Sequence, residues 1–201
     1  SVWGTATMRT GGDDIAQAMA LMGVRPVWAT GSQRVDDFEI LPVSLLDRPR
    51  VDVTLRVSGF FRDAFANLIR LFDAAVQAVA ALDEPDDLNP LAAKVRSERA
   101  QLESEGLSPE VAARQAGWRI FGAKPGAYGA GVQNAIDGRL WQSREDLAEV
   151  YLNWGGYAYG ASDEGTAARG QFAQRLSQVQ AVVQNQDNRE HDLLDSNDYY
   201  Q

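Results

Sequence analysis

The stretch Val51-Asp-Val-Thr-Leu-Arg-Val57 alternates apolar and polar residues, and Ser58 follows it directly. Strict alternation with a period of two predicts a β-strand that buries one face. Ser58 is a preferred helix N-cap residue, and an apolar stripe at helical spacing lies behind it: Phe61, Phe65, Leu68, Ile69, Phe72, Val76 and Val79. The stretch therefore predicts a strand that leads straight into a long amphipathic helix.

The residues before this unit repeat the alternation of strand and helix. The sequence predicts a strand over residues 1–5, a glycine-rich loop over 6–12 and a helix over 13–22, and short β-leaning runs follow at 24–28 and 38–41. Strands separated by helices favour right-handed crossovers and a parallel sheet. We therefore expect an α/β fold, with a Rossmann-like, mostly parallel sheet and flanking helices over residues 1–82.

Residues 83–201 have a mainly helical pattern and end in an acidic segment. Helices are predicted over 90–105 and 109–120, each introduced by an N-cap residue followed by proline. Ser143 opens a capping box, and residues 171–183 form another amphipathic run. Together with the first region, we expect one compact fragment of a larger chain.

Composition excludes several classes of protein. A net charge of -9 and a pI near 4.6 argue against a nucleic-acid surface, which needs clustered Lys and Arg. The absence of cysteine excludes disulfides and zinc–thiolate sites. No apolar run reaches about 18 residues, so no membrane span is predicted and a cytoplasmic location is expected. The chain starts inside a predicted strand and stops at Asp198-Tyr-Tyr-Gln201, with two aromatics that need a packing partner, so we interpret it as a piece of a longer protein.

Two glycine-aromatic loops interrupt the second region: Phe121-Gly-Ala-Lys-Pro-Gly-Ala-Tyr-Gly-Ala-Gly131 and Trp154-Gly-Gly-Tyr-Ala-Tyr-Gly160. Glycine lets a backbone approach a flat ligand, and aromatic rings offer a stacking face. The alternative is two ordinary turns anchored by aromatics. The first loop is not a phosphate loop, because proline follows Lys124, so we expect no ATP binding by this chain.

The strand ends are a second candidate for ligand binding. Ligands on parallel sheets bind beyond the carboxyl ends of the strands, here the loops after Thr5 and Val57. The loop after Thr5 carries hydroxyls, Arg9 and two glycines, which suit an anionic group. A plain strand-to-helix turn explains the same residues equally well.

The last seventeen residues carry the single histidine, His191, among five acids: Asp187, Glu190, Asp192, Asp195 and Asp198. An imidazole among carboxylates can take up protons near neutral pH and offers oxygen and nitrogen ligands to a divalent metal. A solvated chain end is the competing interpretation.

Eight motifs together are specific to one family. They are Trp3-Gly-Thr, Gly11-Gly-Asp-Asp-Ile-Ala-Gln17, Gly23-Val-Arg-Pro-Val27, Arg48-Pro-Arg-Val-Asp-Val53, Ser58-Gly-Phe-Phe-Arg-Asp63, the first glycine-aromatic loop, Trp154-Gly-Gly-Tyr-Ala-Tyr159 and Asn185-Gln-Asp-Asn-Arg-Glu-His-Asp-Leu-Leu-Asp195. In this order they resemble the large, tetrapyrrole-binding subunit of aerobic cobaltochelatase, in the CobN/magnesium-chelatase H-subunit family. The family's proteins are several times longer than this chain.

The resemblance implies a metal chelatase, a ligase that forms nitrogen–metal bonds within a multi-subunit complex. Such an enzyme inserts Co(II), its substrate metal, into the tetrapyrrole hydrogenobyrinic acid a,c-diamide in cobalamin biosynthesis. ATP is then hydrolysed by partner subunits, an AAA+ ATPase and its companion, and the isolated fragment is expected to be inactive. The alternatives are a magnesium chelatase large subunit acting on protoporphyrin IX, or a non-catalytic docking or scaffold portion of the parent.

The resemblance also assigns candidate residues. Metal insertion needs groups that accept ring protons and replace the water ligands of the ion, which suits Glu190, His191, Asp195 and Asp198 as catalytic residues. The first three of these are the candidate metal ligands. The candidate macrocycle-binding residues are Arg9, Arg62, Lys124, Tyr128, Trp154 and Tyr157. For each cation, a solvated surface charge remains the alternative.

Overall fold

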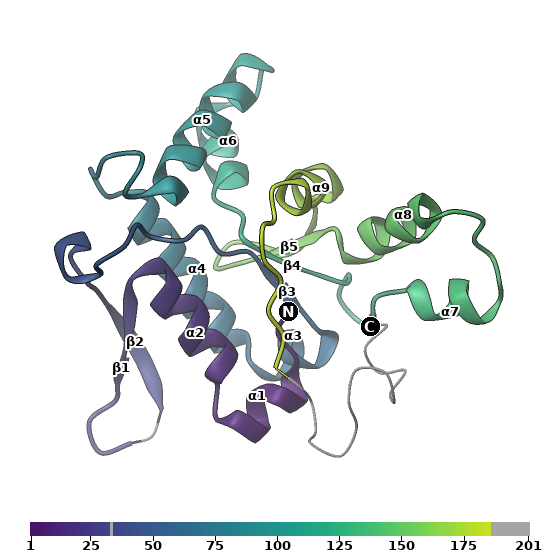
Figure 1. Ribbon diagram of the computed structural model, residues 1–201, viewed down its shortest axis with the longest axis horizontal. Coiled ribbons are helices and arrows are strands. Elements are labelled where there is room, and N and C mark those ends of the chain that lie inside the picture. The colour runs from purple at the N-terminus through teal and green to yellow at the C-terminus, as the bar shows by residue number, and fades with distance from the viewer. Residues whose placement is uncertain (33, 186–201) are drawn as a thin grey trace. The chain divides into compact units, whose positions relative to one another are not determined.

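The computed structural model describes residues 1–32 and 34–185 (Figure 1). The chain divides into two compact units, and each takes segments from both regions distinguished by sequence. The first, called the sheet unit, comprises Ser1–Asp14, Leu55–Ala66 and the described part of Ile120–Gln201. The second, called the hairpin unit, comprises Ile15–Thr54 and Asn67–Arg119.

The sheet unit is built on a four-stranded sheet in the order β3-β4-β5-β6. The strands are Leu55–Val57, Ile120–Gly122, Tyr157–Tyr159 and Glu164–Ala167. The first pair is parallel, with Val57 opposite Gly122, and the two later pairs are antiparallel. Val2 adds a single parallel bridge to Val57.

The expected α/β class with flanking helices is therefore confirmed, but the sheet is mixed instead of mostly parallel. The reason is the length of the connections. A tight turn of four residues joins β5 to β6, and so short a link allows only antiparallel pairing. The parallel pair β3–β4 instead spans the long excursion between Val57 and Ile120.

Five helices of the described chain belong to the sheet unit: α1 Gly4–Thr10, α3 Gly59–Ala64, α7 Val132–Asp137, α8 Arg144–Gly155 and α9 Arg169–Ser177. Ser58 caps α3 as expected, because its side chain accepts from the amide of Phe61. The capping box at Ser143 is also confirmed. The predicted helix over 171–183 is shorter, since α9 ends at Ser177.

The strand predicted over residues 1–5 and the loop over 6–12 are wrong, because α1 occupies most of this stretch. Its start is fixed by tertiary contacts. The amide of Gly4 donates to Ser58 Oγ at 3.2 Å, and a Cβ at Gly4 would lie 2.5 Å from the Phe60 ring. Within the helix the Thr7 hydroxyl donates to the carbonyl of Trp3 at 2.8 Å. Packing against α3 thus overrides weak local helix propensity.

The hairpin unit contains an antiparallel pair, β1 (Val24–Trp28) with β2 (Val35–Ile40). It also holds most of α2 (Asp13–Met22) and α4 (Ala66–Ala80), the short η1 (Val43–Leu45), α5 (Pro90–Ser104) and α6 (Pro109–Ala116). The single long helix predicted after Ser58 is wrong in one respect, because it is divided into α3 and α4 at Phe65. The caps of α5 and α6 are confirmed: Asn89 accepts from Ala92 and Ser108 from Val111.

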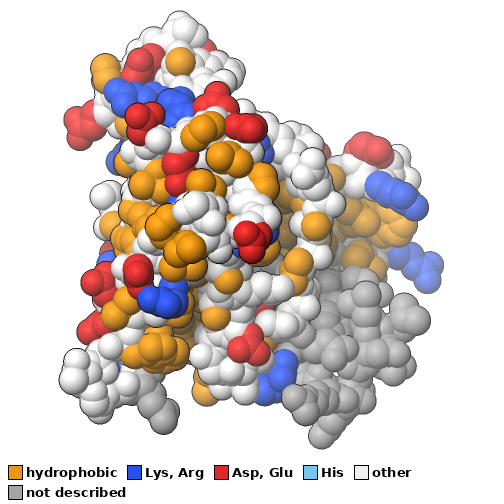
Figure 2. Space-filling view, turned by 60° about the vertical axis from the view of Figure 1, so that its left-hand side comes forward, with side chains coloured by type: hydrophobic (Ala, Val, Ile, Leu, Met, Phe, Trp, Pro, Cys, Tyr) orange, Lys and Arg blue, Asp and Glu red, His pale blue; other side chains and the backbone are white. Residues whose placement is uncertain are grey.

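Surface charge agrees with the composition. On the face drawn in Figure 2, cationic side chains stand in small groups among acidic ones. In the part of the chain that the structure describes, every helix is too short or too polar to span a membrane.

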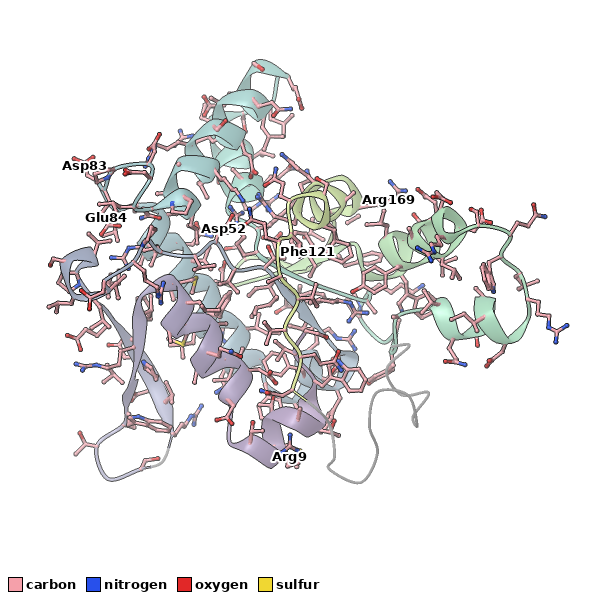
Figure 3. The ribbon with its side chains drawn as sticks, in the orientation of Figure 1. Arg9, Asp52, Asp83, Glu84, Phe121 and Arg169 are labelled. Carbon is pink, nitrogen blue, oxygen red and sulfur yellow. The ribbon has the colours of Figure 1, made fainter. Side chains whose placement is uncertain are left out.

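Buried arginines organise the hairpin unit. Arg50 is only 1% exposed, and it donates to the carbonyls of Met22, Gly23 and Leu41. Both oxygens of Glu84 accept from it, at 2.7 and 2.8 Å. This hydrogen bonding lowers the pKa of Glu84 below its ordinary value. Arg50 therefore ties the end of α2 and the hairpin to the loop that carries Glu84, which is labelled in Figure 3.

We predict that Glu84→Gln destabilises the chain by about 3 kcal/mol at neutral pH, because it leaves Arg50 buried without a counter-charge. The folded-state pKa of Glu84 is lowered, so its contribution is present above the unfolded-state pKa and is lost as pH falls through the lowered value. The difference between the two proteins should therefore disappear in acid. Urea unfolding from neutral to acid pH measures this.

The matched control is Glu103→Gln, which breaks an exposed ion pair with Arg99 and should cost no more than about 0.5 kcal/mol. Equal stability of the Glu84 variant and the wild type at pH 7 would contradict the role of the buried pair.

Candidate functional site

The two glycine-aromatic loops meet at one edge of the four-stranded sheet. Because β3 and β4 are parallel, Val57 and Gly122 end at the same edge, and β5 begins there since Tyr157 pairs with Gly122. The first loop leaves β4 at this point, and Trp154 to Gly156 enter β5 there. We call residues 57–63, 122–131 and 154–157 the loop edge. Carboxyl ends of parallel strands are the usual ligand-binding position of α/β sheets.

Arg62 holds the first loop in place from α3. Its Nη1 donates to the carbonyls of Ala123, Lys124 and Ala127 at 3.2, 2.9 and 2.9 Å. Its Nε and Nη2 bind both oxygens of Asp63, at 2.6 and 2.9 Å. Arg62 is 6% exposed, whereas the side chain of Asp63 is 46% exposed, so the bonds of Arg62 to the loop carbonyls are the better shielded from water. One side chain thus fixes the path of five loop residues.

Tyr128 and Trp154 are the exposed aromatics of this edge, at 59% and 36%. The Tyr128 hydroxyl donates to Asp63 at 2.7 Å, and its ring lies 5.4 Å from the Arg62 guanidinium. Trp154 Nε1 donates to the carbonyl of Tyr128 at 3.2 Å. Hydrogen bonding from Arg62 lowers the pKa of Asp63, and the bond to Asp63 raises the pKa of Tyr128. Asp63 is therefore the charged acceptor and Tyr128 the neutral donor.

Two glycines are required by this packing. A Cβ at Gly59 would lie 2.6 Å from the Tyr128 ring and 2.8 Å from the carbonyl oxygen of Ala127. Gly131 has a φ of 78°, and a Cβ there would lie 2.8 Å from the Trp154 indole. Both glycines let the backbone approach one of the protein's own aromatic rings, and the predicted approach to a flat ligand stays a prediction.

The other candidate macrocycle residues have different settings. Lys124 is exposed in the first loop, and Tyr157 is partly exposed at the start of β5. Arg9 is exposed in the last turn of α1, well apart from Phe121 of the sheet in Figure 3. The structure therefore brings Arg62, Lys124, Tyr128 and Trp154 into one bonded group, places Tyr157 beside it and leaves Arg9 at another position.

The acidic candidates Glu190, His191, Asp195 and Asp198 lie outside the described residues. Asn185, the first residue of their segment, is described, and its side chain donates to Asp14 at 2.7 Å. Burial raises the pKa of Asp14. Over residues 1–32 and 34–185, His, Asp and Glu side chains form no group of three that could hold a metal ion.

Sequence reasoning missed one residue of the loop edge, Asp63, and two that bind it from the sheet, Arg56 and Tyr159. Tyr159 is buried and its hydroxyl donates to the carbonyl of Ala123 at 2.5 Å, while burial raises its pKa. Asp63 follows Arg62 directly, and an adjacent acid and base was the available signal. Arg56 lies at a polar position of the alternating strand, where the pattern predicts only a solvent-facing side chain.

The fold and the loop edge define a mixed α/β protein that presents aromatic faces on a loop held by a buried arginine. The family model described as CobN/Magnesium Chelatase matches residues 1–201, and the chain belongs to this family.

The named relatives are subunits of cobaltochelatases and of magnesium chelatases. The chain is 82% identical to the aerobic cobaltochelatase subunit CobN of Pseudomonas aeruginosa, over 100% of this chain and 16% of that protein. It is 61% identical to CobN of Sinorhizobium sp, with the same coverage. The chloroplastic magnesium-chelatase subunit ChlH of Oryza sativa subsp. japonica is 34% identical, over 99% of this chain and 14% of that protein.

A solved structure, the catalytic subunit of cobaltochelatase from Mycobacterium tuberculosis, has the same fold. Its TM-score is 0.90 at 47% identity, covering 98% of this chain and 16% of that one. The chain thus spans only 16% of the length of these cobaltochelatase relatives.

We predict that Arg62→Lys destabilises the sheet unit by about 2 kcal/mol, because lysine keeps the charge but cannot reach three carbonyls and Asp63 together. Amide hydrogen exchange over residues 123–131 should become at least about tenfold faster, since the loop loses its main bonds. Arg70→Lys, at an exposed arginine, is the control. Unchanged exchange in the loop would show that Arg62 does not hold it.

Proposed function

We propose that this chain is part of the large subunit of a cobaltochelatase, a metal chelatase that inserts Co(II) into a tetrapyrrole in cobalamin biosynthesis. The observation that carries the proposal is the difference in identity between the two branches. The chain is 82% and 61% identical to two CobN proteins along its whole length, against 34% to a magnesium-chelatase subunit. The cobalt branch is therefore favoured over magnesium insertion into protoporphyrin IX.

The finer reaction is part of the same proposal. The macrocycle is hydrogenobyrinic acid a,c-diamide, and ATP is hydrolysed by partner subunits, an AAA+ ATPase and its companion, not by this chain. Since the chain spans 16% of its CobN relatives, we expect no cobalt insertion by the isolated 201 residues.

The loop edge would form one wall of the macrocycle site. A flat, largely apolar ring needs apolar surface with a few polar anchors. Tyr128 and Trp154 offer exposed aromatic faces, and Gly129 and Gly131 between them carry no side chains. Arg62 fixes this wall before the ligand arrives, so little ordering entropy is lost on binding.

The acidic segment would supply the chemistry. Chelation removes protons from ring nitrogens while the hydrated ion loses water. Carboxylates at Glu190, Asp195 and Asp198 and the imidazole of His191 can accept those protons and replace lost water ligands. Cobalt(II) accepts mixed oxygen and nitrogen ligation, which suits Glu190, His191 and Asp195 as its entry ligands.

We predict that Glu190→Ala and Asp195→Ala in the full-length parent each lower ATP-dependent cobalt insertion about a hundredfold, the range of a lost proton acceptor. Macrocycle binding should persist, because the loop edge is untouched. Glu110→Ala, an acid in the first turn of α6, is the control. Cobalt insertion at the wild-type rate by both variants would exclude the catalytic role. Variants that only lose association with the ATPase subunits would favour the docking role instead.

A second prediction concerns the wall. Trp154→Ala in the parent should weaken macrocycle binding about tenfold, because a stacking face and its apolar area are lost. The matched control is Trp141→Ala, at a tryptophan of similar exposure (42%) between α7 and α8. Fluorescence or absorbance titration with the metal-free macrocycle gives both dissociation constants. Equal effects of the two substitutions on the dissociation constant would contradict the role of the loop edge as a wall of the macrocycle site.

A further inference from the structure

Three buried arginines of the described chain have carboxylate partners, as expected from the cost of an unpaired buried charge. Arg50 binds Glu84, Arg62 binds Asp63 and Arg119 binds Asp52, with N–O distances of 2.6 to 2.7 Å. All three guanidinium groups are largely removed from water, at 1%, 6% and 1% exposure of the residue.

Arg56 of β3 departs from this pattern. Its Nη1 donates to the carbonyl of Val57 at 2.5 Å and its Nη2 to the carbonyl of Gly129 at 3.1 Å. Its Nε is buried without an acceptor. Across residues 1–32 and 34–185, no carboxylate oxygen lies within 4.0 Å of it. Burial accordingly lowers the pKa of Arg56.

An aromatic ring lies beside Arg56. Its guanidinium carbon lies 5.6 Å from the centre of the Tyr151 ring, and a guanidinium can stack on such a face. Gly155 lies beside Nε, and a Cβ at this glycine would be 3.4 Å from the Nε atom of Arg56. The residue as a whole is partly exposed, and Nη1 and Nη2 each carry a second N–H beyond the one that binds a carbonyl.

Arg56 also touches the loop edge directly. One of the two carbonyls that it binds belongs to Gly129, which follows the exposed Tyr128, and Trp154 donates to the carbonyl of Tyr128. A ring stacked on Tyr128 or Trp154 would therefore bring its rim close to a cation that lacks a counter-charge. Carboxylates are the groups that a guanidinium binds best in such a setting.

We propose that Arg56 is a ligand-binding residue that receives a peripheral carboxylate of the macrocycle, in place of the protein carboxylate that Arg50, Arg62 and Arg119 each have. The inference rests on the proposed function, since it takes an anionic tetrapyrrole as the ligand. It assigns the anchoring charge to a residue of the sheet, whereas Arg62 is engaged with the loop backbone and Asp63.

The test uses the full-length parent protein and two probes: metal-free hydrogenobyrinic acid a,c-diamide and its fully methyl-esterified derivative, which has the same ring without carboxylates. The ratio of the two dissociation constants is measured for wild type, Arg56→Gln and Arg56→Lys. Arg70→Gln, at an exposed arginine of α4, is the control. Thermal unfolding of each variant is followed in parallel.

Wild type should prefer the acid over the ester, and Arg56→Gln should reduce this preference by about tenfold or more, the worth of one charge-assisted hydrogen bond. Arg56→Lys should retain part of the preference, because it keeps the charge. If Arg56 has a structural role alone, Arg56→Gln should weaken the binding of both probes by the same factor. That result would overturn the inference.

The outcomes separate the two levels of the account. If wild type binds neither probe, the proposed function fails. If wild type binds both equally, the Arg56 inference fails whatever the variants do, including a glutamine variant that does not fold. If wild type prefers the acid and Arg56→Gln keeps that preference unchanged, only the Arg56 inference is lost.

Discussion

The parallel pairing of β3 with β4 is the constraint on which the rest of the site depends. It brings Val57 and Gly122, which are distant in the sequence, to one edge of the sheet. The antiparallel neighbour β5 then starts at that same edge. Every element of the loop edge follows from this register: α3 with Arg62, the first glycine-aromatic loop and the Trp154 turn. A shift of this register by one residue would exchange the faces of Leu55, Arg56 and Val57 and remove Arg56 from the loop.

Arginine side chains are the second organising feature. In both units a buried guanidinium binds several backbone carbonyls and one carboxylate, so a single residue joins segments that share no secondary structure. Such groups are costly to leave unpaired, which makes their geometry stringent. Within the described chain, Arg56 differs because its hydrogen bonds go to the carbonyls of Val57 and Gly129 and no carboxylate pairs with it. The pairing of a guanidinium with a carboxylate, which stabilises the fold elsewhere, is thereby available to a ligand at Arg56.

Local signals in the sequence predicted part of this structure well. The caps at Ser58, Asn89, Ser108 and Ser143 form as expected, since an N-cap depends on neighbouring residues alone. Tertiary contacts decided what was missed: Gly4–Thr10 is helical because it packs on α3, and the three-residue strands β4 and β5 are too short to show alternation. The two loops were recognisable in the sequence by their glycine and aromatic residues. Their proximity depends on the register of the sheet, and the hydrogen bonds of Arg62 depend on the path of the first loop as well. Residue type could therefore nominate Tyr128 and Trp154, while the roles of Asp63 and Arg56 needed coordinates.

The central claim is that the loop edge is a wall of the macrocycle site. Hydrogen–deuterium exchange of the full-length parent, with and without the metal-free macrocycle, tests it most directly. The account predicts slower exchange on binding over residues 123–131 and 154–157, with residues 90–116 of α5 and α6 as an internal reference that does not change. Protection confined to the reference helices, or protection that leaves both loops unaltered, would contradict it.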